Sequence, residues 1–216
     1  MQPAVDINSI EITKAINSNE VRYFVESVEG LVKQLGDKVP VAPIMLSPVD
    51  LPIMLMGLEA WLDLVLTDSA AANRIIEKTT DFFLRLSELY FNAGAAFIVL
   101  PSPFINPGVV TKSIALQSQQ VLHEVFAKTK GPLFLHEGGA RVTPFLEIFK
   151  ALPQVVGVLI NSRDELSVAR ELLGSNAVLA GNFDGPELPG MNENQLREKL
   201  VSILADRRED PHFILA

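Results

Sequence analysis

Short apolar runs alternate along the chain with longer segments in which apolar residues recur at helical spacing. The apolar runs, bounded by turn-forming residues, occupy residues 39–46, 95–100, 132–136, 155–160, 177–181 and 212–216. Helical spacing is found near residues 19–35, 52–65, 69–92, 112–129, 142–151, 164–173 and 192–206. Parallel strands joined by crossover helices produce this alternation. The pattern predicts an α/β fold with six parallel strands and alternating helices, in a single domain over residues 1–216.

Proline and glycine gather where the predicted strands end. Examples are Ser47-Pro48, Pro101-Ser102-Pro103, Gly138-Gly139 and Gly185-Pro186. In parallel α/β folds the loops after the carboxyl ends of the strands carry the chemistry. Functional side chains are therefore expected directly after each strand.

The two ends of the chain fit poorly into a closed fold. Residues 1–18 read as a polar connector, and the last apolar run, residues 212–216, ends with the chain. A final strand without a covering helix presents an exposed edge, which favours association. We expect a second copy or a complementing chain to pair with it.

Charge and composition narrow the classes of function. The 216 residues carry a formal net charge of −8 without a basic run, which argues against nucleic acids and anionic membranes as partners. The absence of cysteine excludes thiolate catalysis and leaves His, Asp and Glu as zinc ligands. With neither a signal peptide nor a membrane-length apolar run, a cytoplasmic location is expected.

Five segments together resemble one known family. LFLHEGGARVTPFLEIF, VVGVLINSRDELSVARELLG and AVLAGNFDGPEL, preceded by SPVDLPIMLMG and NAGAAFIVLPSPFINPG, are similar in order and spacing to the uroporphyrinogen decarboxylase and methylcobamide:coenzyme M methyltransferase (URO-D) family. The resemblance covers residues 25–216. It implies a (β/α)8 TIM-barrel type of fold, incomplete, with the third to eighth strands present and without the first two βα units and the final helix.

His136 is the leading candidate for catalysis because it ends a predicted strand. The resemblance to the methyltransferase branch implies that His136 binds zinc, since that branch has His-x-Cys here, with a second Cys after the last strand. Gly138 stands at the first Cys position. His136 and Glu137 fall short of the three protein ligands of a catalytic zinc, and adjacent extended residues point opposite ways. In the alternative interpretation His136 orients the substrate or is a hydrogen-bonded structural residue.

Other polar residues follow the predicted strands and are candidates for the same rim. We expect Asp184 to take part in catalysis, and a substrate to be bound by Ser47, Asp50, Ser102, Asn106, Glu137, Asn161 and Asn182. Two of these have alternative roles: Asp50 as the N-cap of a helix beginning near Pro52, and Asp184 as the first residue of a turn before Pro186.

Three functions are compatible with the resemblance and with the family positions that this sequence lacks. The first is methyl transfer from a methylcobamide, carried by a partner corrinoid protein, to a small thiol, with zinc as an optional cofactor. His136 and the spacing to Thr143-Pro144 favour it. The second is decarboxylation of uroporphyrinogen in porphyrin biosynthesis. The third is a non-catalytic barrel fragment that pairs with another chain.

Overall fold

A parallel sheet forms the centre of the computed structural model, which describes residues 9–102, 106–183 and 185–216. Its strands follow one another in sequence order: β1 Ile98–Pro101, β2 Leu133–His136, β3 Val155–Leu159, β4 Val178–Gly181 and β5 Phe213–Leu215. All four pairings are parallel. The α/β class and the incomplete barrel type predicted from the sequence are confirmed.

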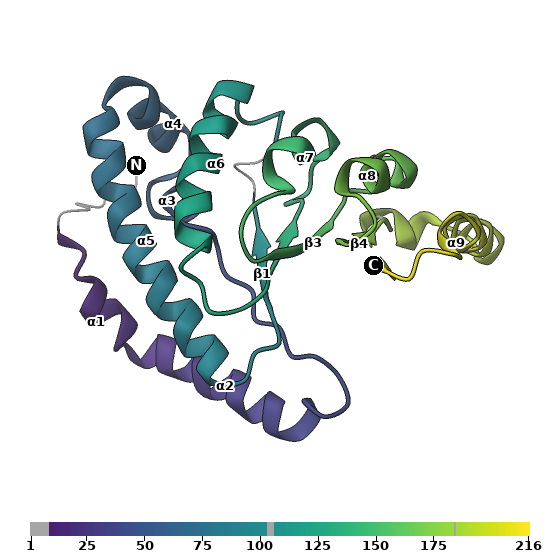
Figure 1. Ribbon diagram of the computed structural model, residues 1–216, viewed down its shortest axis with the longest axis horizontal. Coiled ribbons are helices and arrows are strands. Elements are labelled where there is room, and N and C mark those ends of the chain that lie inside the picture. The colour runs from purple at the N-terminus through teal and green to yellow at the C-terminus, as the bar shows by residue number, and fades with distance from the viewer. Residues whose placement is uncertain (1–8, 103–105, 184) are drawn as a thin grey trace.

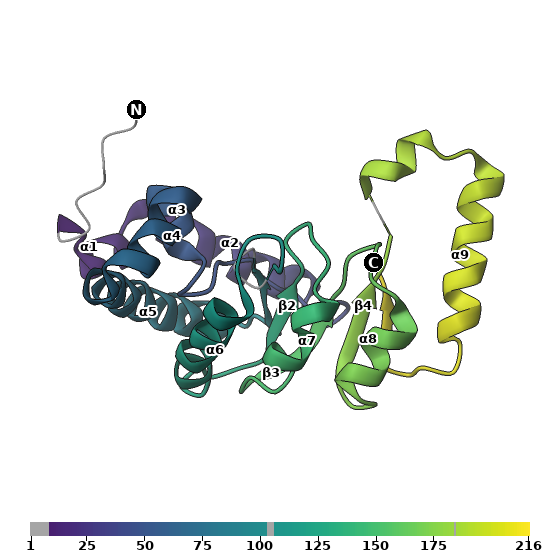
Figure 2. The ribbon, with the colours of Figure 1, turned by 90° about the horizontal axis from the view of Figure 1, so that it is seen from above.

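Helices precede the sheet and alternate with its strands. They are α1 Ile12–Ile16, α2 Asn19–Leu35, α3 Leu51–Met56, α4 Leu58–Thr67, α5 Ser69–Asn92, α6 Lys112–Phe126, α7 Thr143–Phe149, α8 Leu166–Leu173 and α9 Glu193–Arg207, with a 3-10 helix, η3, at Gly185–Gly190. Helices α5 to α8 lie side by side on the same side of the sheet, and α9 stands beyond β5 (Figures 1 and 2). The connections therefore leave the opposite side of the strands open.

The first predicted strand, residues 39–46, is wrong as a full strand. A parallel bridge between Ile44 and Val99 joins it to β1, and the Met45 N–H donates to the Val99 carbonyl at 3.1 Å. Pro43, two residues before Met45, has no N–H and so cannot donate the next hydrogen bond of the ladder to β1. Within the described residues the sheet thus has five strands and one bridged segment in place of six strands.

Two helical expectations also need correction. The predicted helix over residues 52–65 is divided into α3 and α4 at Gly57, whose φ of +86° takes the backbone out of the helical region. The connector expected over residues 1–18 contains α1 within its described part.

The two faces of the strands differ in burial. Side chains that point toward the helices are almost completely buried, namely Ile98, Leu100, Leu133, Leu135, Val158 and Leu179. Those that alternate with them on the inner face are Ile44, Val99, Phe134, His136, Gly157, Leu159, Val178, Ala180 and Ile214, as the register shows. Ile44 is 66% exposed and Ile214 is 52% exposed, so this inner face is open at both edges of the sheet.

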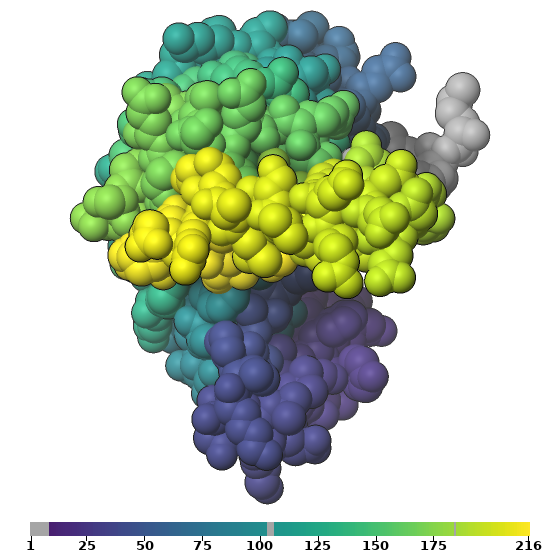
Figure 3. Space-filling view, turned by 90° about the vertical axis from the view of Figure 1, so that its right-hand side faces the viewer, coloured from purple at the N-terminus to yellow at the C-terminus, as the bar shows by residue number. Residues whose placement is uncertain are grey.

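The last strand of the sheet is β5. In the described part of the chain β5 pairs with β4 alone, and Ile214 and Leu215 are exposed. Figure 3 looks at this end of the molecule, where α9 lies across the view between α8 and α2.

Gly157 allows the inner face to pack closely, and replacing it with alanine is expected to destabilise the fold. An added Cβ would lie 2.5 Å from the Phe134 ring and 2.5 Å from the Val178 carbonyl oxygen. Because the carbonyl belongs to a neighbouring strand, we expect Gly157→Ala to lower the free energy of unfolding by about 2 kcal/mol in urea denaturation. Gly30→Ala is the matched control: its Cβ meets nothing within 4 Å in α2, so about 0.5 to 1 kcal/mol of stabilisation is expected. Equal effects at both positions would contradict the close contact at Gly157.

Candidate functional site

The candidate site lies at the carboxyl ends of β2 and β3. His136 is the last residue of β2 and pairs in register with Leu159, which ends β3. Its side chain belongs to the inner face of the sheet and is 35% exposed. The end of β2 therefore presents the imidazole at the rim where the sequence predicts chemistry.

His136 and Glu137 contact each other although they are neighbours in sequence. The Nδ1 atom of His136 lies 3.0 Å from Oε2 of Glu137, and the Gly138 N–H also points at Nδ1, at 3.0 Å. The contact is possible because the chain turns at Gly138 and Gly139, whose φ values are +64° and +90°. Adjacent residues of an extended segment point opposite ways, so the two side chains meet only because the backbone bends here.

Glu137 is held in its charged form by its neighbours. Burial raises the pKa of this carboxyl group, but hydrogen bonds from His136, the Gly139 N–H and Asn161, with the charge of His136, outweigh it and lower the pKa below its ordinary value of 4.5. The Gly139 N–H lies 2.6 Å from Oε2, and Nδ2 of Asn161 lies 3.4 Å from Oε1. A carboxylate with several donors is favoured in this way over the neutral acid.

Acid should remove the stabilisation that Glu137 provides. A group whose pKa is lower in the folded state stabilises the fold above its unfolded pKa and loses this contribution as pH falls through the folded pKa. The urea stability of Glu137→Gln should therefore lie below that of the wild type at pH 7, and the difference should shrink below about pH 4.5. A difference that stays constant from pH 7 to pH 3 would contradict the assignment of this carboxylate.

Asn161 and Arg163 extend the contacts from β2 to the loop after β3. Oδ1 of Asn161 accepts from the Arg163 backbone N–H at 3.1 Å and from its Nε at 3.0 Å, and Nη2 of Arg163 donates to the Gly139 carbonyl at 3.3 Å. We call His136, Glu137, Asn161 and Arg163 the rim cluster. Arg163 is absent from the sequence-based candidates; its place two residues after Asn161, in a loop that follows a strand, was the available signal.

Asp164 is a second residue that the sequence-based candidates omit. Its buried carboxylate accepts from the Val142 N–H at 3.0 Å and the Thr143 N–H at 3.1 Å, and from the Thr143 hydroxyl. The helix predicted to open at residue 164 begins at Leu166 instead. Asp164 therefore binds the start of α7, which follows the His136 turn.

Asn182, a predicted substrate ligand, uses its amide nitrogen inside the protein. Nδ2 donates to the Asp164 carbonyl at 2.8 Å and is 3.4 Å from the Asn161 carbonyl. The end of β4 thereby supports the loop that carries the rim cluster. Asp184, the second predicted catalytic residue, lies outside the described residues.

Ser47, Asp50 and Ser102 form a second, fully buried group, the Asp50 cluster. The Ser47 hydroxyl donates to Oδ2 of Asp50 at 2.5 Å, and the Ser102 hydroxyl donates to the same oxygen at 3.1 Å. Asp50 stands at the N-cap position of α3, as the alternative interpretation has it, but its side chain makes no cap bond. The Ser102 N–H donates to the His136 carbonyl at 3.1 Å and joins this cluster to β2.

Among the residues that the structure describes, Asn106 bonds to neither cluster. Its side-chain oxygen accepts from the Gly108 N–H at 2.7 Å and folds its own turn. The structure thus brings together His136, Glu137, Asn161 and Asn182, sets Ser47, Asp50 and Ser102 beside them, and leaves Asn106 in a local turn.

The residues near His136 do not fit a zinc site. Among the described residues no three His, Asp or Glu side chains gather closely enough to hold a metal ion. His136 and Glu137 bind each other, and Gly138, at the position of the family's Cys, has the positive φ that favours glycine. His123 and His212 are exposed on other elements. A catalytic zinc needs three protein ligands, and this donor set does not supply them.

Comparisons with known proteins agree with this fold. The family model described as "Uroporphyrinogen decarboxylase (URO-D)" matches residues 1–216. No curated protein matches the sequence. In the part of the chain that the structure describes, no helix combines the length and apolar composition needed to cross a membrane.

A solved structure similar to the chain is a methyltransferase from Methanosarcina mazei. It is 17% identical in sequence and superposes with a TM-score of 0.84. The match covers 98% of this chain and 62% of the methyltransferase, so the chain spans less than two thirds of that protein. The neighbour supports the fold. Because the family model matches residues 1–216, the chain belongs to the uroporphyrinogen decarboxylase (URO-D) family.

Proposed function

We propose that the chain serves a methyltransferase of the URO-D family that moves a methyl group from a methylcobamide, presented by a corrinoid protein, to a small thiol. The observation that carries the proposal is His136 at the end of β2, oriented by Glu137 and placed on the open inner face of the sheet. The likeness to a methyltransferase structure supports the reaction class. The whole protein's activity is part of the proposal, because the chain spans 62% of that neighbour.

The reaction needs a nucleophilic sulfur and a site that receives its proton. The thiol sulfur supplies the electron pair of the new S–CH3 bond, and the pair of the broken carbon–cobalt bond stays on the cobalt of the donor. The thiol proton leaves to a base. An imidazole beside a carboxylate is suited to take this proton, because its free ring nitrogen is a base and the carboxylate stabilises the imidazolium that forms.

Decarboxylation of uroporphyrinogen is the second candidate. Arg163 in the rim cluster, and Arg141, whose Nε lies 3.7 Å from the Asp164 carboxylate, are cations at the same rim. Arginine is well suited to bind carboxylates, which this substrate carries. The methyl-transfer proposal is preferred because it gives His136 a chemical role.

One assay separates the two candidates. The chain is incubated with methylcobalamin and 2-mercaptoethanesulfonate, and the S-methyl product is measured by mass spectrometry; a parallel sample receives uroporphyrinogen. We expect methylation above the buffer rate, at least 100-fold slower in His136→Gln and unchanged in His123→Gln, since His123 is exposed on α6. Decarboxylation without methylation would replace the proposal with the second candidate, and no turnover of either would overturn it.

A further inference from the structure

We infer that the His136–Glu137 pair itself removes the proton from the acceptor thiol, with His136 as the catalytic base and Glu137 as its positioning residue, in place of activation by a bound metal ion. The inference rests on the proposed methyl transfer for its substrate. Its structural core, a paired imidazole whose second nitrogen is the base, can be tested separately.

Two contacts at Nδ1 of His136 favour opposite forms of the neutral ring. The Gly138 N–H can donate only to an Nδ1 that carries no proton, whereas Oε2 of Glu137, at 3.0 Å, accepts from an Nδ1 that does. Hydrogen bonds to a charged acceptor are about twice as strong as those between neutral groups. The carboxylate therefore favours the Nδ1–H form, which leaves the lone pair on Nε2.

Other groups hold the Glu137 carboxylate in place for this role. One oxygen accepts from the Gly139 N–H at 2.6 Å and the other faces Nδ2 of Asn161 at 3.4 Å. Asn161 is in turn fixed through its Oδ1 by Arg163. These contacts keep the carboxylate charged and directed at His136, as an orienting carboxylate requires.

The same geometry disfavours His136 as a metal ligand. Oε2 of Glu137 already contacts His136 and accepts from the Gly139 N–H. The described residues supply no third metal ligand beside His136 and Glu137. The turn that brings Glu137 onto Nδ1 depends on the positive φ of Gly138, the position where the family's methyltransferase branch places its Cys. The pair and a His-x-Cys metal site are thus alternative uses of one turn.

The proposed step is a balanced proton transfer. The S–H bond breaks and its electron pair stays on sulfur, while the proton bonds to Nε2 of His136. The resulting imidazolium carries its positive charge next to the Glu137 carboxylate, which stabilises it. Nothing is oxidised or reduced in this step.

The form of the ring can be measured without any turnover. Nitrogen-15 NMR distinguishes Nδ1–H from Nε2–H imidazoles, and the chain has three histidines, so His123→Gln and His212→Gln assign the signals. At a pH where the ring is neutral, we expect His136 of the wild type to be mainly Nδ1–H, and to become mainly Nε2–H in Glu137→Gln, where the Gly138 N–H contact dominates. A wild-type His136 that is mainly Nε2–H, or one unchanged in Glu137→Gln, would overturn the inference.

Metal binding supplies the second arm. The wild-type chain, mixed with equimolar zinc and passed through a desalting column, should keep no more metal than His136→Gln, as measured by mass spectrometry. One zinc per chain that is lost in His136→Gln would overturn the inference. If the NMR result holds while methylation fails, the His136–Glu137 pair stands and the proposed function fails. Methylation that chelators abolish would support the proposed function and overturn the inference, because the thiol would then be activated by a metal ion.

Discussion

Replacing Arg170 with glutamine is expected to lower the free energy of unfolding by about 3 kcal/mol, the cost typical of removing one partner from a poorly exposed ion pair. The guanidinium of Arg170 binds Asp210 through two bonds, Nε to Oδ2 at 2.7 Å and Nη2 to Oδ1 at 3.0 Å. Its side chain is 16% exposed and that of Asp210 is 12% exposed. Water therefore cannot readily replace these bonds.

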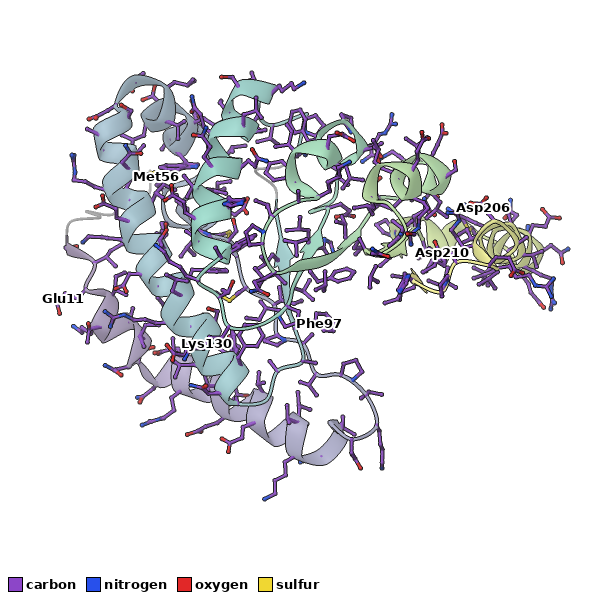
Figure 4. All side chains as sticks on the ribbon, viewed as in Figure 1. Glu11, Met56, Phe97, Lys130, Asp206 and Asp210 are labelled. Carbon is purple, nitrogen blue, oxygen red and sulfur yellow. The ribbon has the colours of Figure 1, made fainter. Side chains whose placement is uncertain are left out.

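Arg170 also ties several backbone segments to α8. It donates to the carbonyls of Gly174, Ala177 and His212, which lie at the end of α8, before β4 and before β5. Asp210 lies in the turn between α9 and β5, and Asp206 lies on α9 (Figure 4). Loss of the guanidinium should therefore loosen the end of the sheet that already has an open edge.

The matched control is Arg197→Gln in α9. Arg197 and Glu193 form an exposed pair one turn apart, at 3.6 Å, and such pairs contribute about 0.3 to 0.5 kcal/mol. Both variants remove one arginine, so they change the net charge equally. Urea denaturation followed by circular dichroism measures both, and similar losses of stability would contradict the role assigned to Arg170.

The strands β1 to β4 could be predicted from the sequence because each is a short apolar run between turn residues. Residues 39–46 have the same apolar character, but this segment does not form a full strand. Whether it can do so depends on which of its N–H groups must donate to the neighbouring strand. Pro43 shows this: its place in the register beside β1 is known only when the strands are paired.

The sequence predicts at which end of the strands the candidate side chains lie, but it does not predict which of them contact one another. Residues after strand ends come to one rim, so His136, Glu137 and Asn161 were found from order alone. The His136–Glu137 contact requires a turn with two positive φ values. The Gly138-Gly139 pair permits this turn but also permits other backbone conformations, so the sequence does not predict it. The bond between Asp50 and Ser102 could not be predicted, because the two residues are 52 positions apart and no local pattern reveals such a contact.

Asp164→Asn should have the other large effect, a loss of about 3 kcal/mol of stability, because the carboxylate accepts several bonds in a buried place. Oδ1 and Oδ2 both face N–H groups, those of Thr143 and Val142. An asparagine has one oxygen, so its NH2 group must face one of these N–H groups. Hydrogen bonds to charged groups contribute about 1.5 to 3 kcal/mol each, and a buried donor left without an acceptor adds to the loss.

The same substitution should change the protection of two particular amides. The Val142 and Thr143 N–H groups begin α7 and depend on Asp164, so they should exchange with deuterium faster in Asp164→Asn than in Asp37→Asn, an exposed control with the same change of charge. Asn182 donates to the backbone carbonyl of Asp164, which the substitution keeps, so β4 should lose only the protection that follows from the lower global stability. A loss of protection at Val142 and Thr143 that is larger than the loss in β4 would show that Asp164 also positions the loop beside His136, whereas equal losses in both places would contradict that role.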